Sequence, residues 1–313
     1  MSLYFGAAYL YCATLQLVFI KHRNEVVAIV NESIKLQKYF EENYLSKGIY
    51  EQGKRFRFYI LSGWAFTYLF YGVILMPMFV IHKSEGRYLS YHVLGTFYSH
   101  RETEHIALAV AFVYEFWFFS TQFGAALLQI YINSLYLQTM STSMNGLRLR
   151  ASCLITNQFK RRRMMLMTLR AYPKLRILST LYNETIGQHF LARFKSCLGI
   201  CTVGAAFIFI KLLGMKDILI TTMGGSGVIV AGTMFYVLAK LCSKVHSGSI
   251  QLQTSLQAQK LPERKIHKQM ACYKVIAVNI GSFYIVKRST PLTMLGMISN
   301  TTMTTLISVN FST

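Results

Sequence analysis

The sequence is short of acidic residues, with 12 Asp and Glu against 33 Lys and Arg. Charged residues make up 14% of the chain, whereas soluble domains average about 25%. Together with a hydrophobic content of 53%, this shortage indicates a membrane protein. A strongly basic chain can also bind nucleic acid, but here the basic residues alternate with apolar blocks and do not gather on one soluble face. We therefore expect a lipid bilayer and no nucleic acid as partner.

The sequence also lacks the motifs of enzymes and of metal sites. It contains no nucleophile–base arrangement, phosphate loop or nucleotide fingerprint, and His92, His100 and His105 do not form the two-His metalloprotease pattern. Cys197 and Cys201 lie four residues apart in an apolar helix, where packing is the better explanation than metal or redox chemistry. No cysteine falls in the segments expected outside the cell, so no disulfide framework is implied. We expect a protein that is not an enzyme and has no cofactor.

Six stretches are apolar and long enough to cross a bilayer, which takes roughly 20 residues. Of the 33 Lys and Arg, 28 fall in the alternate segments 21–57, 141–195 and 240–288, which places these segments in the cytoplasm. The last span therefore runs outward and the C-terminus is extracellular. The predicted spans are 3–20, 58–81, 107–137, 196–213, 218–239 and 289–310.

The first span does not resemble a signal peptide, because its positive charges follow the apolar run and no basic region precedes it. With segment 21–57 in the cytoplasm, the first span would start outside the cell. We therefore expect one further helix upstream, which gives seven helices in all and a cytoplasmic N-terminus. The fold class is thus an all-α polytopic bundle.

The cytoplasmic segments are long and carry helical apolar stripes. We expect helices that extend into the cytoplasm and pack together, with Pro173 in the first turn of one of them. One stripe comprises Val26, Val30, Ile34, Tyr39 and Tyr44, and the other Leu175, Leu178, Tyr182, Ile186, Phe190 and Phe194.

Aromatic residues on the second and third spans could line a cavity for a small organic ligand. The alternative is that they are packing residues and interface anchors. Glu115 is a carboxylate within a span and so a functional candidate, although it could also be paired or hydrated near the outer end. The candidate ligand-binding residues are Tyr68, Tyr71, Met76, Phe79, Tyr114, Glu115, Trp117, Phe118, Gln122, Met223 and Ser226.

The fifth span, 218–239, is rich in glycine. Small residues let helices approach closely, and this packing role is favoured over room for a ligand at Gly225. A transporter that uses Glu115 and this helix is the alternative function.

The last span is the most polar, with Ser, Thr or Asn at about half of the positions 289–310. Such a helix is poorly suited to lipid but fits a water-filled axis shared by several chains. The candidate pore and gate residues are Thr301, Thr302, Thr305, Leu306 and Val309.

Two segments, LRILSTLYNETIGQHF and VIAVNIGSFYIVKRSTPLTMLGMISNTTMTTLIS, are similar to the arthropod gustatory and odorant receptor superfamily. The second resembles that family's two-part last helix, with a cytoplasmic half at about 263–286, a break near 289–291 and a membrane half. The gustatory branch usually ends in Thr-Tyr, five residues and Gln-Phe, whereas here Met303-Thr304 and Asn310-Phe311 occupy these places. The taste and smell branches stay open, and the chain resembles a divergent member.

The resemblance implies a tetrameric ligand-gated cation channel, homomeric or with a co-receptor, in the plasma membrane of sensory neurons. Its ligand would be a tastant or odorant bound in the outer half of each subunit. Residues 1–140 would hold peripheral spans of the ligand-binding part. Residues 141–313 would hold cytoplasmic anchor helices, two spans and the last, pore-lining helix. The expected upstream helix agrees with the seven helices of the family.

Overall fold

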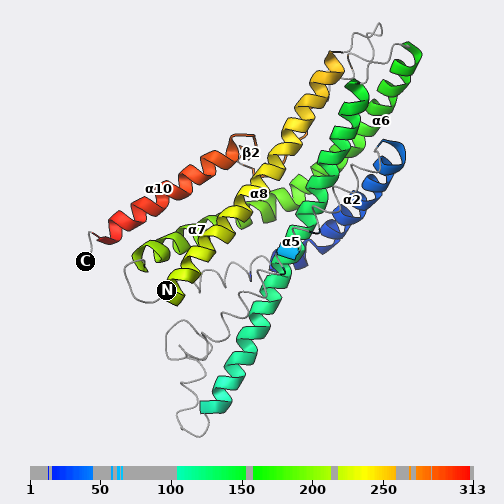
Figure 1. The fold of residues 1–313 in the computed structure, drawn as a ribbon. Helices are drawn as coiled ribbons and strands as arrows, with labels where there is room; N and C mark the ends of the chain where they lie inside the picture. Colours follow the sequence, from blue (N-terminus) through cyan, green and yellow to red (C-terminus); the bar gives the residue numbers. More distant parts are fainter. Residues whose placement is uncertain are drawn as a thin grey trace. The chain divides into compact units, whose positions relative to one another are not determined.

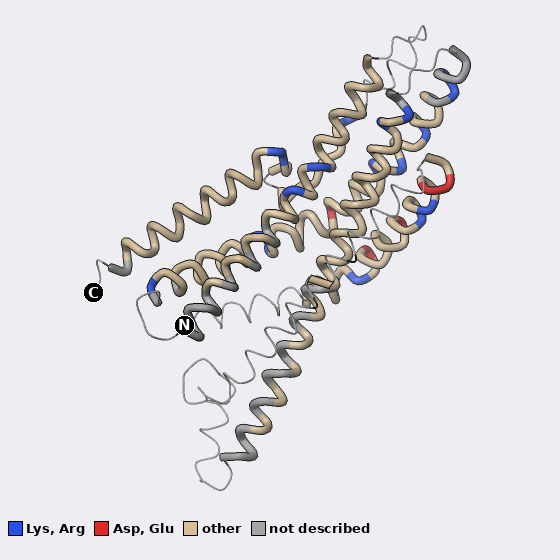
Figure 2. Tube along the Cα trace, in the orientation of Figure 1, with Lys and Arg blue, Asp and Glu red and all other residues tan. Residues whose placement is uncertain are grey.

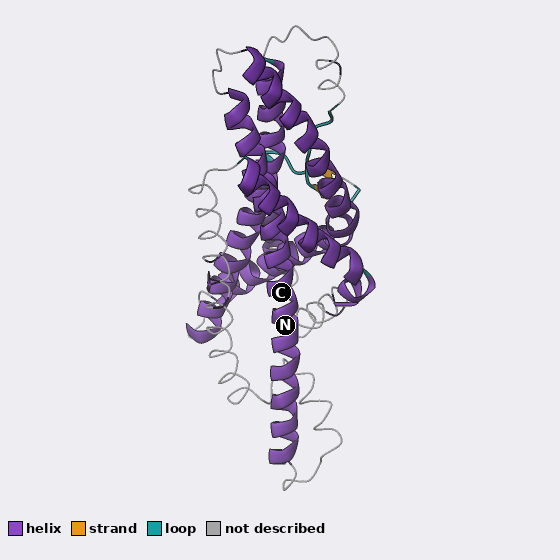
Figure 3. Cartoon of the chain, turned by 90° about the vertical axis from the view of Figure 1, so that its right-hand side faces the viewer, coloured by secondary structure: helices purple, strands orange, loops and turns teal. Residues whose placement is uncertain are grey.

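The structure is a computed structural model in which two compact units are described. One unit comprises Met1–Ile20 and Lys54–Ser134, and the other Lys21–Gly53 and Leu135–Thr313. The described part of the second unit is almost entirely helical (Figure 3). The described residues are 13, 16–44, 58, 62, 63, 65, 104–152, 158–212, 218–258, 268, 273–282 and 284–310.

Helix α5 (Glu104–Ser152) begins in the first unit and ends in the second. Its 49 residues would span about 74 Å at 1.5 Å per residue, more than twice the thickness of the hydrocarbon core of a bilayer. Helix α8 (Ile218–Gln257) likewise continues without a break beyond the apolar stretch 218–239. Both helices thus continue beyond the predicted spans 107–137 and 218–239, and the cytoplasmic position expected of such extensions stays a prediction.

The second unit is a bundle built around a helical hairpin (Figure 1). Helices α7 (Ala192–Leu212) and α8 are joined by a short connection and pack against each other, and α10 (Thr290–Asn310) packs against both. Helix α2 (Arg23–Asn43) packs on α6 (Gln158–Tyr182) and on the π-helix η1 (Asn183–Leu191). The bounds of α7 and α10 agree with the predicted helices 196–213 and 289–310.

One predicted apolar stripe is buried as expected and the other is wrong in part. Leu175, Leu178, Tyr182, Ile186, Phe190 and Phe194 are all buried, so the stripe along α6, η1 and α7 is confirmed. On α2, however, Ile34 is 50% exposed. The buried residues of α2 are Val26, Ile29, Ser33, Leu36 and Phe40. These intervals of three and four residues follow the helical repeat, whereas the predicted intervals of four and five drift off the buried face.

The continuous helix formed by α6 and the following π-helix η1 has two irregularities that were not predicted correctly from the sequence. Pro173, expected in a first turn, lies inside α6, which begins at Gln158. A proline has no amide hydrogen, so the carbonyl four residues earlier, that of Leu169, lacks its helical donor. From Asn183 the helix widens into the π-helix η1. The return from i+5 to i+4 pairing after a π segment leaves one further carbonyl without a helical donor.

Residues 273–282 and 284–289, which precede α10, are not helical, so the helix predicted at about 263–286 is wrong there. We call these residues the strap. Strands β1 (Asn279–Ile280) and β2 (Tyr284–Ile285) pair in antiparallel fashion, with Asn279 opposite Ile285 and Ile280 opposite Tyr284. Gly281 in the turn has φ 62°, a left-handed conformation that favours glycine. The strap is not helical, because many of its backbone amides and carbonyls form hydrogen bonds with α6, η1 and α8.

The described chain is mostly helical, which agrees with the predicted all-α class apart from the short hairpin. Within the described residues, no helix meets the length and hydropathy expected of a membrane span. Figure 2 shows Lys and Arg on α2, on α6 and just before the first turn of α10, whereas α10 itself, from Thr290 to Asn310, has no charged residue.

Candidate functional site: the strap and the last helix

The strap is held to the bundle in part by hydrogen bonds to backbone carbonyl groups of α6 and η1. The hydroxyl of Tyr273 donates to the carbonyl oxygen of Leu169 at 3.0 Å, the carbonyl that Pro173 leaves without a helical donor. The amide of Gly281 donates to the carbonyl oxygen of Gly187 at 2.9 Å, within the π-helix. Helices α6 and η1 thus each supply one carbonyl acceptor to the strap.

Asn183, the first residue of η1, clamps the strap with both ends of its side-chain amide. Its Nδ2 donates to the carbonyl oxygen of Ala277 at 2.9 Å, and its Oδ1 accepts from the amide of Asn279 at 2.9 Å. This pairing copies the donor–acceptor pair that a neighbouring strand would offer. Asn183 therefore fixes the position of the strap along the helix.

Gly187 brings the backbones of η1 and the strap close together. A Cβ atom at this position would lie 2.8 Å from the carbonyl oxygen of Asn279, closer than van der Waals contact allows. Glycine is needed here for close approach.

Polar side chains of α6 and α8 hold the first part of the strap. The hydroxyl of Tyr172 donates to the carbonyl oxygen of Lys274 at 2.8 Å, and Gln253 Nε2 donates to that of Tyr273 at 2.6 Å. The amide of Ile276 donates to Ser249 Oγ at 2.8 Å. Three elements of the bundle, α6, η1 and α8, thus bind the segment that leads into α10.

Helix α10 begins with a hydrogen-bonded turn at the end of the strap. The amide of Lys287 donates to Thr290 Oγ1 at 2.8 Å, and the amide of Thr290 donates to the carbonyl oxygen of Lys287 at 3.1 Å. Pro291 suits this first turn because its missing amide hydrogen is not required there. The strap and the start of α10 are therefore joined closely.

Five hydroxyl groups in the second half of α10 are bonded within their own helix. Each of these donates to the carbonyl oxygen four residues earlier at 2.8–2.9 Å. These bonds satisfy the hydroxyl hydrogens locally, which explains how one helix carries so many of them. The donors are Thr301, Thr302, Thr304, Thr305 and Ser308.

One face of α10 is packed and the remainder is exposed in the single chain. Pro291, Met294 and Thr302 are buried, and Ile298 and Thr305 on the same side are half-buried. Of the predicted pore residues, Thr301 is exposed, Leu306 is half-buried, and Thr302 is 6% exposed. The side chain of Val309 is outside the described residues.

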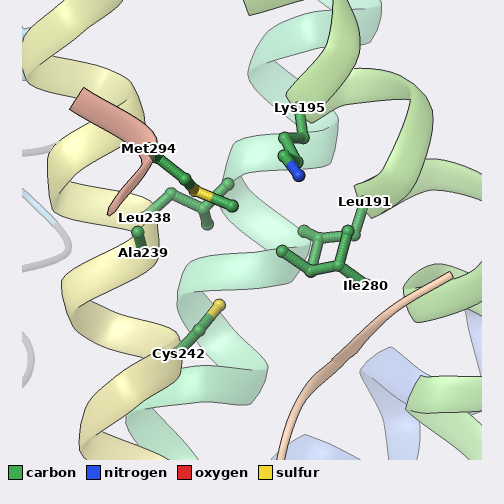
Figure 4. Close-up of a pocket in the computed structure, with 7 residues that line it drawn as sticks. All are labelled: Leu191, Lys195, Leu238, Ala239, Cys242, Ile280 and Met294. Atoms are coloured by element: carbon green, nitrogen blue, oxygen red, sulfur yellow. The ribbon is translucent and has the colours of Figure 1, made fainter. Parts of the chain in front are cut away.

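A small cavity lies beneath the first turns of α10 (Figure 4). Its volume is about 20 Å³, room for about one water molecule, so it is not an organic-ligand pocket. Burial raises the pKa of the Cys242 thiol to about 12, and desolvation lowers the pKa of Lys195, whose Nζ lies 4.3 Å from the centroid of the Tyr284 ring. The lining residues are Leu191, Lys195, Leu238, Ala239, Cys242, Ile280 and Met294.

Most of the predicted ligand-binding side chains lie outside the described residues. Tyr68, Tyr71, Met76 and Phe79 are not described at all. Tyr114 and Trp117 are exposed on α5, with ring centroids 6.3 Å apart. For the rest only the helical backbone is described, in α5 or α8: Glu115, Phe118, Gln122, Met223 and Ser226.

Two glycines of the predicted span 218–239, Gly225 and Gly232, have surroundings that the structure describes. A Cβ atom on Gly225 would lie 3.1 Å from the ring of Phe209 on α7, whereas one on Gly232 would have no neighbour within 4 Å. Gly225 therefore permits close packing of α7 and α8, as the packing interpretation predicted.

The residues that bind the strap were missed as functional candidates. Asn183 and Gly187 lie within LYNETIGQHF, one of the two segments that carry the sequence resemblance, and this was the only signal that could have found them. Their partners, residues 274–281, are too distant in sequence for any local pattern to link them.

The bundle with its strap and final helix matches a solved receptor fold. The chain is similar to the insect olfactory receptor OR5 from Machilis hrabei, with a TM-score of 0.66 and 13% identity over 96% of this chain and 79% of that chain. No family model and no curated protein matches the sequence. The chain thus has the fold of an insect olfactory receptor, and the resemblance expected from the sequence is confirmed at the level of the fold.

Proposed function

We propose that the chain is a subunit of a chemosensory receptor that acts as a ligand-gated, non-selective cation channel. The observation that carries this proposal is the fold, shared with an insect olfactory receptor over 96% of the chain. In this proposal the protein spans the plasma membrane of sensory neurons with its C-terminus outside. Four copies, or copies with a co-receptor, assemble around one axis.

The surface of α10 supports its assignment to the pore. The helix is free of charged residues, and the side opposite its packed face carries Gly296, Asn300 and Met303, all exposed. Thr301 is also exposed, on the flank between this surface and the packed face, whereas Thr302 faces the bundle. In an assembly the exposed surface is available to line a water-filled axis. We assign Thr301 to the pore and Thr302 to packing, with Leu306 and Val309 as candidates for the hydrophobic constriction.

The strap would connect ligand binding to the pore. A small organic ligand would bind in the outer part of the protein, among the predicted aromatic residues on α5 and the neighbouring span. Movement of the bundle would then reach α10 through the strap, because the strap is bonded to α6, η1 and α8 and ends at the first turn of α10. The ligand would act by favouring one of two positions of α10.

The test is a current measurement on cells that express the full-length protein. We expect a cation current that depends on ligand, and a raised basal leak in Leu306→Ser because water enters a polar constriction more easily. Ile177→Ser, a change at a 70% exposed residue of α6, is the matched control and should leave the leak unchanged. Unaltered leak and conductance in Leu306→Ser and Val309→Ser would contradict the pore assignment. Substrate flux without conductance, lost in Glu115→Gln, would support the carrier alternative.

A further inference from the structure

Where the start of α2 lies against η1, two histidine rings meet near two further basic side chains. The imidazole rings of His22 and His189 are stacked, with centroids 4.6 Å apart and planes inclined by 17°. Burial and the nearby charges of His22, Arg193 and Lys21 lower the pKa of His189. We call Lys21, His22, His189 and Arg193 the cationic cluster.

The cluster has little negative charge of its own. Among the described residues, its one carboxylate contact within 4 Å is Glu25, whose Oε1 lies 3.9 Å from His22 Nδ1. Lys21, Arg193 and Glu25 are exposed, and both imidazoles are half-buried. Gathering like charges costs free energy unless an anion joins them. The cluster is therefore prepared for a negatively charged ligand.

The chemistry of the four side chains favours a phosphate monoester. Arg, Lys and protonated His offer hydrogen-bond donors and no acceptor. A phosphate monoester offers up to two negative charges and three acceptor oxygens, and the guanidinium fork matches its geometry. A carboxylate offers one charge and two oxygens, which leaves more of the donors unmatched.

The place of the cluster in the chain points to a lipid as the source of that phosphate. Lys21 directly follows the predicted span 3–20, and Arg193 closely precedes the predicted span 196–213. In the proposed orientation both segments lie at the cytoplasmic face of the bilayer, where lipid headgroups are found. We propose that the cationic cluster binds the phosphorylated headgroup of an anionic lipid in the cytoplasmic leaflet.

This inference rests on the membrane orientation of the proposed function and adds a regulator to it. His189 belongs to η1, the same π-helix whose Asn183 and Gly187 hold the strap. A bound headgroup would join the start of α2 to η1. The lipid would thereby stabilise the form of η1 that binds the strap.

The test is a titration of the purified, detergent-solubilised full chain with a water-soluble phosphatidylinositol monophosphate. We expect the thermal unfolding midpoint to rise with lipid concentration, because a ligand that binds only the folded state stabilises it. The double variant Lys21→Gln/Arg193→Gln should bind at least tenfold more weakly. Arg163→Gln/Lys244→Gln also removes two exposed cations, from α6 and α8, and should bind as the unmodified chain does.

Two further ligands separate the sources of the phosphate. Phosphatidylinositol, which lacks the monoester, and inorganic phosphate should both produce a much smaller shift. Equal shifts with inorganic phosphate would overturn the lipid assignment, and so would equal affinity of the two double variants. Absence of any shift would overturn the site itself. Because the titration needs no channel activity, a cluster-dependent shift in a protein without ligand-gated current would count against the channel proposal alone.

Discussion

The strap and α10 adjoin in the sequence, yet they satisfy their polar groups in opposite ways. The strap is bonded to side chains of α6, η1 and α8 and to carbonyl groups of α6 and η1. Five hydroxyls of α10 are bonded to carbonyls of α10 itself. The first arrangement ties a segment to its surroundings, and the second leaves a helix free to shift without breaking its own bonds. We infer that the strap is the fixed part and α10 the movable part.

The largest change in stability is expected from the loss of the two hydrogen bonds between the Asn183 side chain and the strap. Asn183→Leu removes one donor and one acceptor and leaves the carbonyl of Ala277 and the amide of Asn279 unpaired. The expected loss of stability is about 3 kcal/mol, seen as a lower thermal unfolding midpoint of the purified protein. Asn300→Leu changes the same residue type at an exposed position of α10 and should alter the midpoint little. A similar fall in both variants would contradict the proposed difference between strap and helix.

A smaller loss of stability is expected for Gly187→Ala. The added Cβ would lie 2.8 Å from the carbonyl oxygen of Asn279, so the strap must move at a cost of about 1–3 kcal/mol. Gly296→Ala is the matched change in α10, where nothing lies within 4 Å, and it should stabilise the helix by up to about 1 kcal/mol. Opposite shifts of the unfolding midpoint are the expected result, and shifts of the same sign would refute it.

The role of Pro173 can be tested with a double-mutant cycle. Tyr273→Phe removes the hydrogen bond to the carbonyl of Leu169 and should cost about 1 kcal/mol. In a Pro173→Ala background the restored amide of residue 173 can donate to that carbonyl, so the same change should cost less. Identical costs in the two backgrounds would show that Pro173 does not supply the acceptor.

The smallest expected effect is the dependence of stability on pH. The pKa values of His189 and His246 are lowered, first by burial and then by neighbouring charges. A folded-state pKa below the unfolded value means that the unfolded chain binds protons first, so stability is present above about pH 6.5 and falls as the pH drops below it. The unfolding midpoint should fall between pH 7.5 and 5.5, and less so in His189→Asn/His246→Asn. A midpoint with the same pH dependence as that of Lys244→Gln would contradict this.

The helices could be predicted from the sequence where their patterns are local. The apolar stretches gave the positions of α7 and α10, and the stripe from Leu175 to Phe194 gave the buried face of α6, η1 and α7. Ile34 was misplaced because the chosen intervals exceeded the helical repeat. Pro173 was placed at a helix start because a proline inside a helix needs an outside donor for the freed carbonyl, and Tyr273 supplies it from 104 residues away.

The strap could not be predicted, since VIAVNIGSFYIV has the apolar content of a buried helix or a buried strand. What decides between them is a set of acceptors and donors on Tyr172, Asn183, Gly187 and Ser249. On α10 the abundance of hydroxyls was evident, but its division into a packed and an exposed side was not, because Ser, Thr and Asn occur on both.

The most direct test of the pore assignment compares two adjacent positions of α10. Thr301→Cys and Thr302→Cys would be expressed as full-length protein and exposed to a water-soluble, positively charged thiol reagent during ligand-evoked current. Cys242 is buried and its pKa is raised to about 12, so it should not react, and the unmodified chain reports any background. We predict rapid loss of current in Thr301→Cys and none in Thr302→Cys. Equal rates at the two positions, or no effect at Thr301→Cys, would contradict the claim that the exposed side of α10 lines the pore.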